Sequence, residues 1–464
     1  MGAGDVDSRV RTLAARITEC VGAAALALQC TATAEGVDTV RTQRRSRWPR
    51  ISLQATLAAA IVGSASAQGI YPGDLPKDGY KLPGGAEPVL QLRTYYMDQE
   101  NLAGVPGEAW ALGGWAGLRT PWWGDMLQLG LVGYTSQKLY GPDGKGGTRL
   151  LTPDQEPIAV IGEAFAALRF AGQTATVYRQ LLNRPFINPQ DNRMVPNTFE
   201  AYTIAGAVDS GKDTLSYIGG YIAKIKLRDA SSFRWMSDGA GGQGDHQGVV
   251  FAGGTYTFDK ARNGYLRVDE QYGVDTYNTF YVDVRYPLAL DDKTTLVLGA
   301  QGYPQSAVGD KQIGSFSTWG YGLQAALASG PFGAQLYWTQ TGKDRDTLNP
   351  YGDHPSYLNL MQVPFNTAGE KAWGIGGNVD FAPFGAPGLS AAAIYASGSD
   401  RIAFATRAPI GDRNETNVRV DYAFPKGSAA EGLSGAVRYS WLRQDGAAQT
   451  GTQLRIYLNY AVRF

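Results

Sequence analysis

The sequence lacks long apolar runs and has few residues that bind metals. Mean hydropathy is slightly negative at −0.24, and no stretch approaches the ~20 consecutive apolar residues of a membrane-spanning helix. Both cysteines, Cys20 and Cys30, precede residue 68, and the only histidines are His246 and His354. Residues 68–464 therefore hold neither a disulfide nor a thiolate metal site, and we expect no metal and no cofactor.

The chain also lacks an excess of charge of either sign. It has 42 basic and 42 acidic residues in 464 positions. Eight arginines and five acids lie before residue 68, which leaves 34 basic and 37 acidic residues in the remainder. Without a basic excess, nucleic acid is not an expected partner.

Glycine and aromatic residues are abundant instead, with 60 Gly, 26 Tyr and 10 Trp. This enrichment without long apolar runs is typical of antiparallel β-barrels whose rings gather at the membrane interfaces. A lipid-facing barrel strand is apolar only at every second residue, so its average hydropathy stays polar. The alternative is a large secreted all-β protein.

The N-terminal part has the order of a secretory signal. Arginines cluster between residues 44 and 50, an apolar stretch of thirteen residues runs from Ile51 to Gly63, and Ala65-Ser66-Ala67 forms an A-x-A site. We predict cleavage after Ala67; an amphipathic anchor helix is the alternative. Residues 1–43 lead to the hypothesis that translation starts further downstream, near Val40. The predicted parts are therefore 1–67 (removed), 68–87 (a short periplasmic lead-in) and 88–464 (the barrel).

The last strand is the clearest. Alternate residues from Leu454 to Phe464 are apolar, and those between them include Arg455, Asn459 and Arg463. Strict alternation over about eleven residues is the signature of a lipid-facing strand. The final Phe464 resembles the C-terminal signal of outer-membrane proteins that the barrel assembly machinery reads.

The same period recurs along the chain, as in Tyr217–Leu227, where we place Tyr217, Tyr221, Ile225 and Leu227 on one face. We predict a transmembrane antiparallel β-barrel of about eighteen strands. The strands start near residues 89, 109, 126, 162, 174, 198, 215, 249, 265, 279, 294, 319, 332, 372, 389, 417, 433 and 453.

Loop lengths support this count. Short connections rich in Gly, Pro and Asp, such as Arg119–Asp125 and Ser329–Pro331, alternate with long ones, such as Leu181–Asn197 and Thr341–Lys371. Short periplasmic turns and long external loops are the barrel pattern. A soluble β-sandwich does not require short and long connections to alternate in this way.

Three segments resemble the OprD family of outer-membrane porins. They are NRPFINPQDNRMVPNTFEAY at 183–202; YLNLM at 357–361 with FN at 365–366 and GEKAWG at 369–374; and DRNETNVRVDY at 412–422. The resemblance spans most of residues 88–464. It implies an eighteen-stranded, often monomeric barrel in the outer membrane with a narrow pore that selects amino acids, peptides or small carboxylates. It also implies that the third loop, Leu181–Asn197, folds inward as a constriction.

Selectivity in such a channel depends on pore width and lining charge. Our strand register points a set of arginines into the lumen, where a guanidinium can pair with a carboxylate, and the resemblance implies a ladder of basic side chains there. An equally plausible interpretation is that inward acids such as Asp283 and Asp421 satisfy them. The predicted pore-lining residues are Arg93, Arg285, Arg419, Arg438, Arg455 and Arg463, and the charged residues of the constriction loop are Arg184, Asp191 and Arg193.

Other classes remain open. A barrel enzyme would need a histidine at the rim, and His246 and His354 each follow an aspartate in a predicted external loop. A plugged transporter needs a large domain before the barrel, whereas only about twenty residues, Gln68–Glu87, separate the leader from the first strand. A trimeric general-diffusion porin of sixteen strands differs by one hairpin. Expected partners are small solutes, outer-membrane lipid and lipopolysaccharide; the protein could be a monomer or a trimer.

Overall fold

The computed structural model describes residues 85–259 and 264–461. The predicted signal peptide, its cleavage site, most of the lead-in, Arg463 and Phe464 lie outside the described residues. The strands are β1 (Glu87–Glu100), β2 (Pro106–Arg119), β3 (Leu127–Tyr140), β4 (Ile158–Phe170), β5 (Gln173–Gln180), β6 (Thr198–Ser210), β7 (Asp213–Lys226), β8 (Arg234–Trp235), β9 (Val249–Asp259), β10 (Gly264–Gly273), β11 (Tyr277–Ala289), β12 (Thr294–Ala307), β13 (Ser317–Ser329), β14 (Phe332–Thr341), β15 (Lys371–Asp380), β16 (Leu389–Ser399), β17 (Arg413–Ala423), β18 (Leu433–Gln444) and β19 (Gly451–Ala461). The one-turn helix α3 (Met236–Gly239) follows β8, and a 3-10 turn, η2 (Ala382–Phe384), follows β15.

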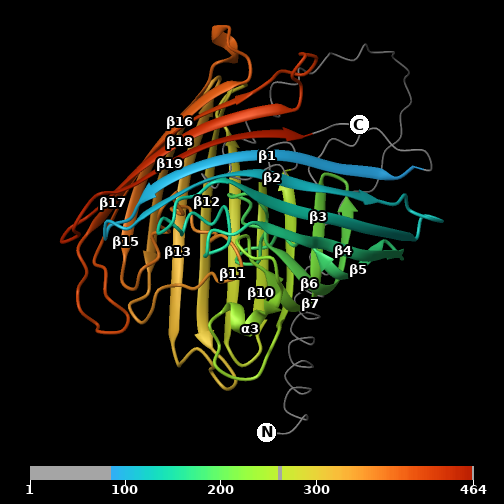
Figure 1. Ribbon diagram of the computed structural model, residues 1–464, viewed down its shortest axis with the longest axis horizontal. Coiled ribbons are helices and arrows are strands. Elements are labelled where there is room, and N and C mark those ends of the chain that lie inside the picture. The colour runs from blue at the N-terminus through green and yellow to red at the C-terminus, as the bar shows by residue number, and fades with distance from the viewer. Residues whose placement is uncertain (1–84, 260–263, 462–464) are drawn as a thin grey trace, which may run out of the picture. The chain divides into compact units, whose positions relative to one another are not determined.

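The sheet closes on itself. Each long strand pairs antiparallel with its neighbours in chain order, and β1 pairs with both β2 and β19, so the blue and red ribbons lie side by side in Figure 1. The two-residue β8 pairs only with the end of β7, and β7 continues the ring through β9. The result is a closed ring of eighteen antiparallel strands with no free edge.

All eighteen predicted strands are present, and each begins within four residues of its predicted start. The strands could be predicted because their outward residues are apolar and alternate with inward polar residues. On β1, Leu92 is 50% exposed, whereas its neighbours Gln91 and Arg93 are each 4% exposed. This apolar-out, polar-in order is the reverse of a soluble protein and fits a wall with lipid outside.

Aromatic side chains form two belts on this outer wall. Toward the long-loop end of the strands lie the exposed rings of Trp110, Tyr202, Trp319, Trp338, Trp373 and Trp441; toward the short-turn end lie Trp123, Phe170, Tyr286, Phe332, Phe384 and Phe424. Aromatic belts mark the two interfaces of a bilayer. They place Trp123 at the interface on the short-turn side. Among the described residues, no helix is long and apolar enough to cross a membrane.

The register of β7 is where the simple alternation is wrong. Lys224 pairs with Glu200 but Ile222 pairs with Ala201, so Ala223 forms a bulge. Beyond the bulge the faces exchange, because one extra residue reverses the period of two. Ile225 is therefore fully buried on the inward face, on the opposite side from Tyr217 and Tyr221.

The barrel interior is filled by inward-folded loops. One buried cluster joins Leu150 and Leu151 of the loop between β3 and β4 to Met194 and Val195 of the third loop, against the inward faces of β1 and β2. A second joins the third loop to the wall formed by β6, β7 and β9. The apolar core therefore lies inside the ring and holds the loops in the lumen.

Candidate functional site: a narrowed lumen

The third loop runs from residue 181 to 197, the bounds predicted from the sequence, and crosses the lumen. Of its seventeen residues only Asn183 is exposed. One end is bonded to β10 and the other to β1, strands that lie about halfway round the ring from each other. The loop therefore spans the interior as a shelf.

At the β1 wall, the loop is held by a buried ion pair. Arg93 Nη1 and Nη2 donate to the two carboxylate oxygens of Asp191 at 2.6 and 3.1 Å. Arg93 also donates to the Arg193 carbonyl at 2.5 Å and to Asn459 Oδ1 at 2.8 Å. This bidentate geometry is the strong form of an arginine–carboxylate contact.

At the opposite wall, Arg184 makes the corresponding contact. Its Nε donates to Asp269 Oδ1 on β10 at 2.7 Å, and Gln271 of the same strand donates to the Pro185 carbonyl. The prolines at 185, 189 and 196 are all buried, and each fixes its own φ. Two of the three predicted charged residues of the loop, Arg184 and Asp191, thus anchor it.

A second long loop, 342–370, also folds inward and meets the third loop. The Asn188 amide donates to the Asp353 carbonyl at 2.9 Å, and the Asp353 backbone N–H donates back to Asn188 Oδ1 at 2.7 Å. Gly352 fits this clasp closely, since an added Cβ would lie 2.6 Å from Asn188 Oδ1. No pattern in the sequence predicts that this segment narrows the pore.

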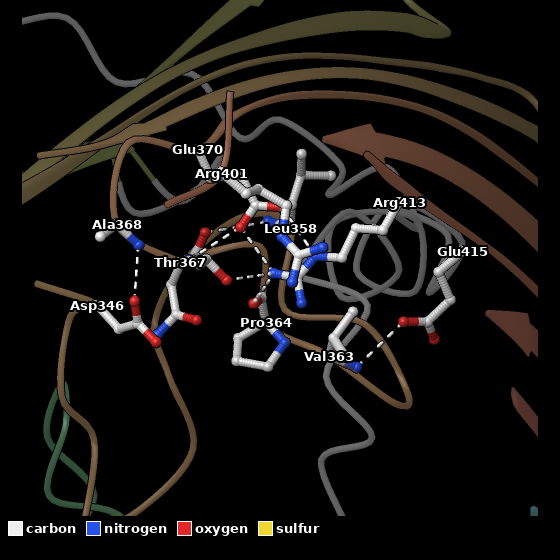
Figure 2. A network of polar contacts seen from close by, with 12 residues as sticks. Asp346, Leu358, Val363, Pro364, Thr367, Ala368, Glu370, Arg401, Arg413 and Glu415 are labelled. Carbon is white, nitrogen blue, oxygen red and sulfur yellow. Dashed lines mark hydrogen bonds and ion pairs between the residues drawn. The ribbon is translucent and has the colours of Figure 1, made fainter. Parts of the chain in front are cut away.

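Figure 2 shows how the loop 342–370 is fixed to the wall. Glu370 is fully buried, and Arg413 donates to its two oxygens at 2.8 and 2.7 Å. Glu415 accepts the backbone N–H groups of Gln362 and Val363 at 2.9 and 3.1 Å. These carboxylates satisfy loop backbone that has no strand partner, which makes the loop part of the lumen wall.

Below the third loop lies a cavity of about 400 Å³. Its lining combines Asp191, Asn192 and Arg193 of the loop with inward residues of β1, β18 and β19 and with the β15–β16 turn. The charged lining residues are Arg93, Arg193, Arg438, Asp191, Asp380 and Asp421, and Tyr95, Tyr422 and Tyr457 add aromatic surface.

Arg193 differs from the other lining arginines because it has no carboxylate partner within the described residues. Its Nε donates to the Thr148 carbonyl at 2.7 Å and its Nη1 to the Asn192 carbonyl at 2.8 Å. Burial, and then repulsion from Arg455 and Arg228, hold the pKa of Arg193 well below its ordinary value. Burial and the charge of Arg149 similarly lower the pKa of Arg228 to about 10.

These four guanidinium groups, Arg149, Arg193, Arg228 and Arg455, are defined here as the arginine cluster. Only Arg149 has a carboxylate partner in the described chain, Asp229, at 3.8 Å. Asp229 and Asp353 also act electrostatically on Arg228, and Glu415 lies within electrostatic reach of Arg455. Arg193 is the member of the cluster that lines the cavity.

The other predicted pore arginines have mixed placements. Arg419 pairs with Arg438 across β17 and β18, and Arg438 with Arg455 across β18 and β19, so the three form a row around the wall. Of these only Arg438 lines the cavity. Arg455 instead donates to the Met361 carbonyl at 2.8 Å and holds the loop 342–370. Arg285 is half-buried on β11 near the Tyr265 ring, 5.9 Å away, and does not line the cavity.

Of the two inward acids named from the sequence, Asp421 contacts arginines of this row. Asp421 pairs with Arg419 at 2.9 Å and with Arg438 at 3.3 Å. Asp283 instead accepts the hydroxyls of Tyr265 and Tyr357 at 2.7 and 3.0 Å. Asp380 also lines the cavity, and its carboxylate accepts only the Ala382 N–H, at 2.9 Å, among the described residues.

Neither histidine pairs with the aspartate that precedes it. His354 is buried against Phe186 and Tyr303, its Nε2 lies 2.9 Å from the Thr347 hydroxyl, and burial lowers its pKa to about 3. His246 is exposed and contacts Asp238 at 2.9 Å. No group of three or more His, Asp or Glu in the described ranges is arranged to hold a metal ion.

A closed barrel with aromatic belts and loops that narrow its lumen is a channel of the porin class. The profile described as "outer membrane porin, OprD family" matches residues 84–464. The chain belongs to the OprD family of outer membrane porins, and its location is the outer membrane.

Named relatives agree with this assignment. Porin D of Pseudomonas aeruginosa is 22% identical over 407 residues, which cover 80% of this chain and 89% of the relative. The BenF-like porin of Pseudomonas fluorescens Pf-5 superposes with a TM-score of 0.73 at 20% identity and covers 82% of this chain and 99% of that one. OpdK of Pseudomonas aeruginosa, solved with vanillate, gives 0.71 at 19% identity and covers 81% and 98%.

Proposed function

We propose that this porin is a narrow channel, without catalytic activity, that selects small solutes bearing a carboxylate. The observation that carries the proposal is the arginine cluster beside the third loop, with Arg193 at the cavity surface and without an ion pair to a carboxylate in the described chain. A guanidinium keeps its charge and offers paired donors that match a carboxylate. The vanillate bound to OpdK, itself a carboxylate, is consistent with this choice.

A narrow pore is favoured over general diffusion by the way the lumen is filled. The third loop is bonded to both sides of the ring, and the loop 342–370 is clasped to it through Asn188 and Asp353. These two loops are hydrogen-bonded to each other inside the barrel, and we infer that a solute passes through the charged cavity beside them. Selectivity then follows from lining charge as well as from width.

A second candidate is a solute that carries both charges, such as an amino acid or a short peptide. It is favoured by Asp380, which lines the same cavity and has no cationic partner in the described chain. A cation on the solute could contact Asp380 while its carboxylate contacts Arg193. Assembly by the barrel machinery and the state of monomer or trimer stay predictions.

Reversal potential in planar bilayers tests the proposal. With a salt gradient across the bilayer, the mature protein should prefer anions, and Arg193→Gln should reduce this preference and weaken block by small carboxylates by about tenfold, the worth of one charge-assisted contact. Arg443→Gln removes an exposed arginine at the long-loop end of β18 as a matched control. If Arg193→Gln leaves the preference for anions unchanged, Arg193 does not belong to the site that determines selectivity. If Asp380→Asn weakens channel block by amino acids and Arg193→Gln does not, the result favours the second candidate, a solute that carries both charges.

A further inference from the structure

The hydrogen-bonded wall of the barrel is interrupted where the third loop leaves it, above the end of β5. The last pairing of β4 with β5 at the long-loop end joins Ala164 to Arg179, and β5 ends at Gln180. Residues 158–163 of β4 therefore have a ladder partner only on the β3 side. Side chains, and not a strand, close the wall between this part of β4 and the start of β6.

Lys226, the last residue of β7, lies at this interruption. Its ladder partner is Thr198, the first residue of β6, and its side chain is fully buried. The ammonium donates to the carbonyl of Pro196, at the end of the third loop, and lies 5.6 Å from the centre of the Tyr134 ring. Tyr134 belongs to β3 and pairs with Val160, which lies in the part of β4 without a second strand partner. Lys226 thus connects β7 both to the third loop and to the far side of the interruption.

The aromatic ring that faces Lys226 is itself fixed. Gly162 is the extra residue of a β-bulge in β4, and a Cβ there would lie 1.8 Å from Cδ2 of Tyr134. The Tyr134 hydroxyl donates to the buried carboxylate of Glu163 at 2.6 Å, and the Trp115 ring meets the tyrosine edge-on at 5.7 Å. A cation within about 6 Å of the face of such a ring is attracted to it. The site of the ammonium is therefore built from several strands.

The residue two positions beyond Lys226 holds the same end of the third loop. The Arg228 backbone N–H donates to Asn197 Oδ1 at 2.7 Å, and its guanidinium donates to Asn192 Oδ1. Lys226 and Arg228 therefore hold residues 192–197, the half of the loop that carries Arg193 into the lining of the cavity.

The burial of Lys226 has a cost in stability. Its ammonium has no ion pair in the described chain, and Asp229 and Asp191 act on it electrostatically from further away. A buried ammonium without an ion-pair partner destabilises a fold, whereas an apolar side chain of similar length avoids that cost. Because folded proteins break such rules mainly at functional positions, we expect a functional reason for this lysine.

We propose that Lys226 is a positioning residue of the channel, whose ammonium holds the second half of the third loop and thereby sets the width of the lumen. Lys226 does not line the cavity, so it acts through the loop and not on the solute. The proposal rests on the hydrogen bond to Pro196, and it holds whether or not the channel selects carboxylates.

Single-channel recording of the full mature protein in planar bilayers tests this role. Lys226→Met keeps the length of the side chain but removes the donor. The ratio of time spent in wide and narrow conductance states should therefore rise by about tenfold, the worth of one hydrogen bond from a charged donor. Lys224→Met is the matched control, because it removes a cation two residues away that contacts Glu200 and not the third loop; its conductance should be normal.

Thermal unfolding of the same variants, followed by heat-modified gel mobility, distinguishes positioning from general support of the barrel. Lys226→Met removes a buried charge without an ion pair, so its unfolding temperature should equal or exceed that of the unaltered protein. A lower unfolding temperature together with altered conductance would mean that Lys226 only supports the fold. Normal conductance of Lys226→Met would mean that the loop is held without it. Either result overturns the proposal.

A double variant shows whether the effect passes through the third loop. Asp191→Asn frees the loop from the β1 wall, where Asp191 pairs with Arg93. If Lys226 acts by holding the same half of the loop, adding Lys226→Met to Asp191→Asn should change the conductance by less than Lys226→Met does alone. Two effects that simply add would place the action of Lys226 outside the loop and would also overturn the proposal.

Discussion

Replacing Asp191 by asparagine should release the third loop from the β1 wall. The carboxylate is 5% exposed and receives both terminal nitrogens of Arg93, which is 4% exposed. Removing one partner of a buried ion pair costs about 3–5 kcal/mol. Arg93 keeps its contacts with the Arg193 carbonyl and Asn459, so the low end applies.

A cost of about 3 kcal/mol shifts the docked-to-released equilibrium of the loop by a factor of about 150. The barrel itself should persist, because its strands pair independently of this contact and the Arg184–Asp269 anchor remains at the far wall. Single-channel recording of Asp191→Asn should therefore show larger and more variable unitary conductance. Anion preference should rise as well, since Arg93 loses its counter-charge.

A double variant distinguishes the charge pair from simple packing. Arg93→Met/Asp191→Leu replaces both partners with apolar side chains of similar length, which is often close to neutral for stability. Its conductance should return toward that of the unaltered protein. The reasoning fails if Asp191→Asn conducts normally, or if the double variant is as open as the single one.

Two further predictions concern the loop 342–370. Gly352→Ala places a Cβ 2.6 Å from Asn188 Oδ1 and 2.7 Å from its backbone nitrogen, so overpacking of about 1–3 kcal/mol should loosen the clasp; faster trypsin cleavage within the loop checks this, and unchanged cleavage contradicts it. Burial lowers the pKa of His354 to about 3. Between about pH 6.5 and pH 3, His354 therefore takes up a proton when the loop 342–370 is released but stays neutral while the loop is docked. Docking should weaken by about 2 kcal/mol at pH 5 relative to pH 7, seen as noisier conductance in acid, and His354→Phe should abolish that dependence.

The strands could be predicted because lipid imposes one rule on every outward position. Leu92, Leu323 and Val437 are each about half exposed, and an apolar residue at every second position has no other explanation in so polar a chain. At the Ala223 bulge the backbone geometry breaks this rule, and the prediction that Ile225 shares a face with Tyr217 and Tyr221 is wrong. A bulge changes the register without leaving a mark in the alternation.

The lumen was less predictable because its polar side chains have several possible partners. Arg93 and Arg438 line the cavity, and the third loop runs from residue 181 to 197; their roles in selectivity stay predictions. Nothing in the spacing shows that Asp191 rather than Asp283 pairs with Arg93, or that Arg455 holds the loop 342–370. Those pairings join residues far apart in the chain.

The lumen wall carries two kinds of arginine, which differ in whether a carboxylate partner is present. Arginines that pair with a carboxylate, such as Arg93 and Arg413, hold loops, and replacing their partner changes the shape of the lumen. Arg193 has no such partner in the described chain; replacing it removes a charge that a solute meets, together with the hydrogen bonds to the Thr148 and Asn192 carbonyls. Asp191→Asn should therefore raise both the unitary conductance and the preference for anions, whereas Arg193→Gln should lower the preference for anions. The opposite signs of the change in ion preference distinguish the two variants in one bilayer experiment.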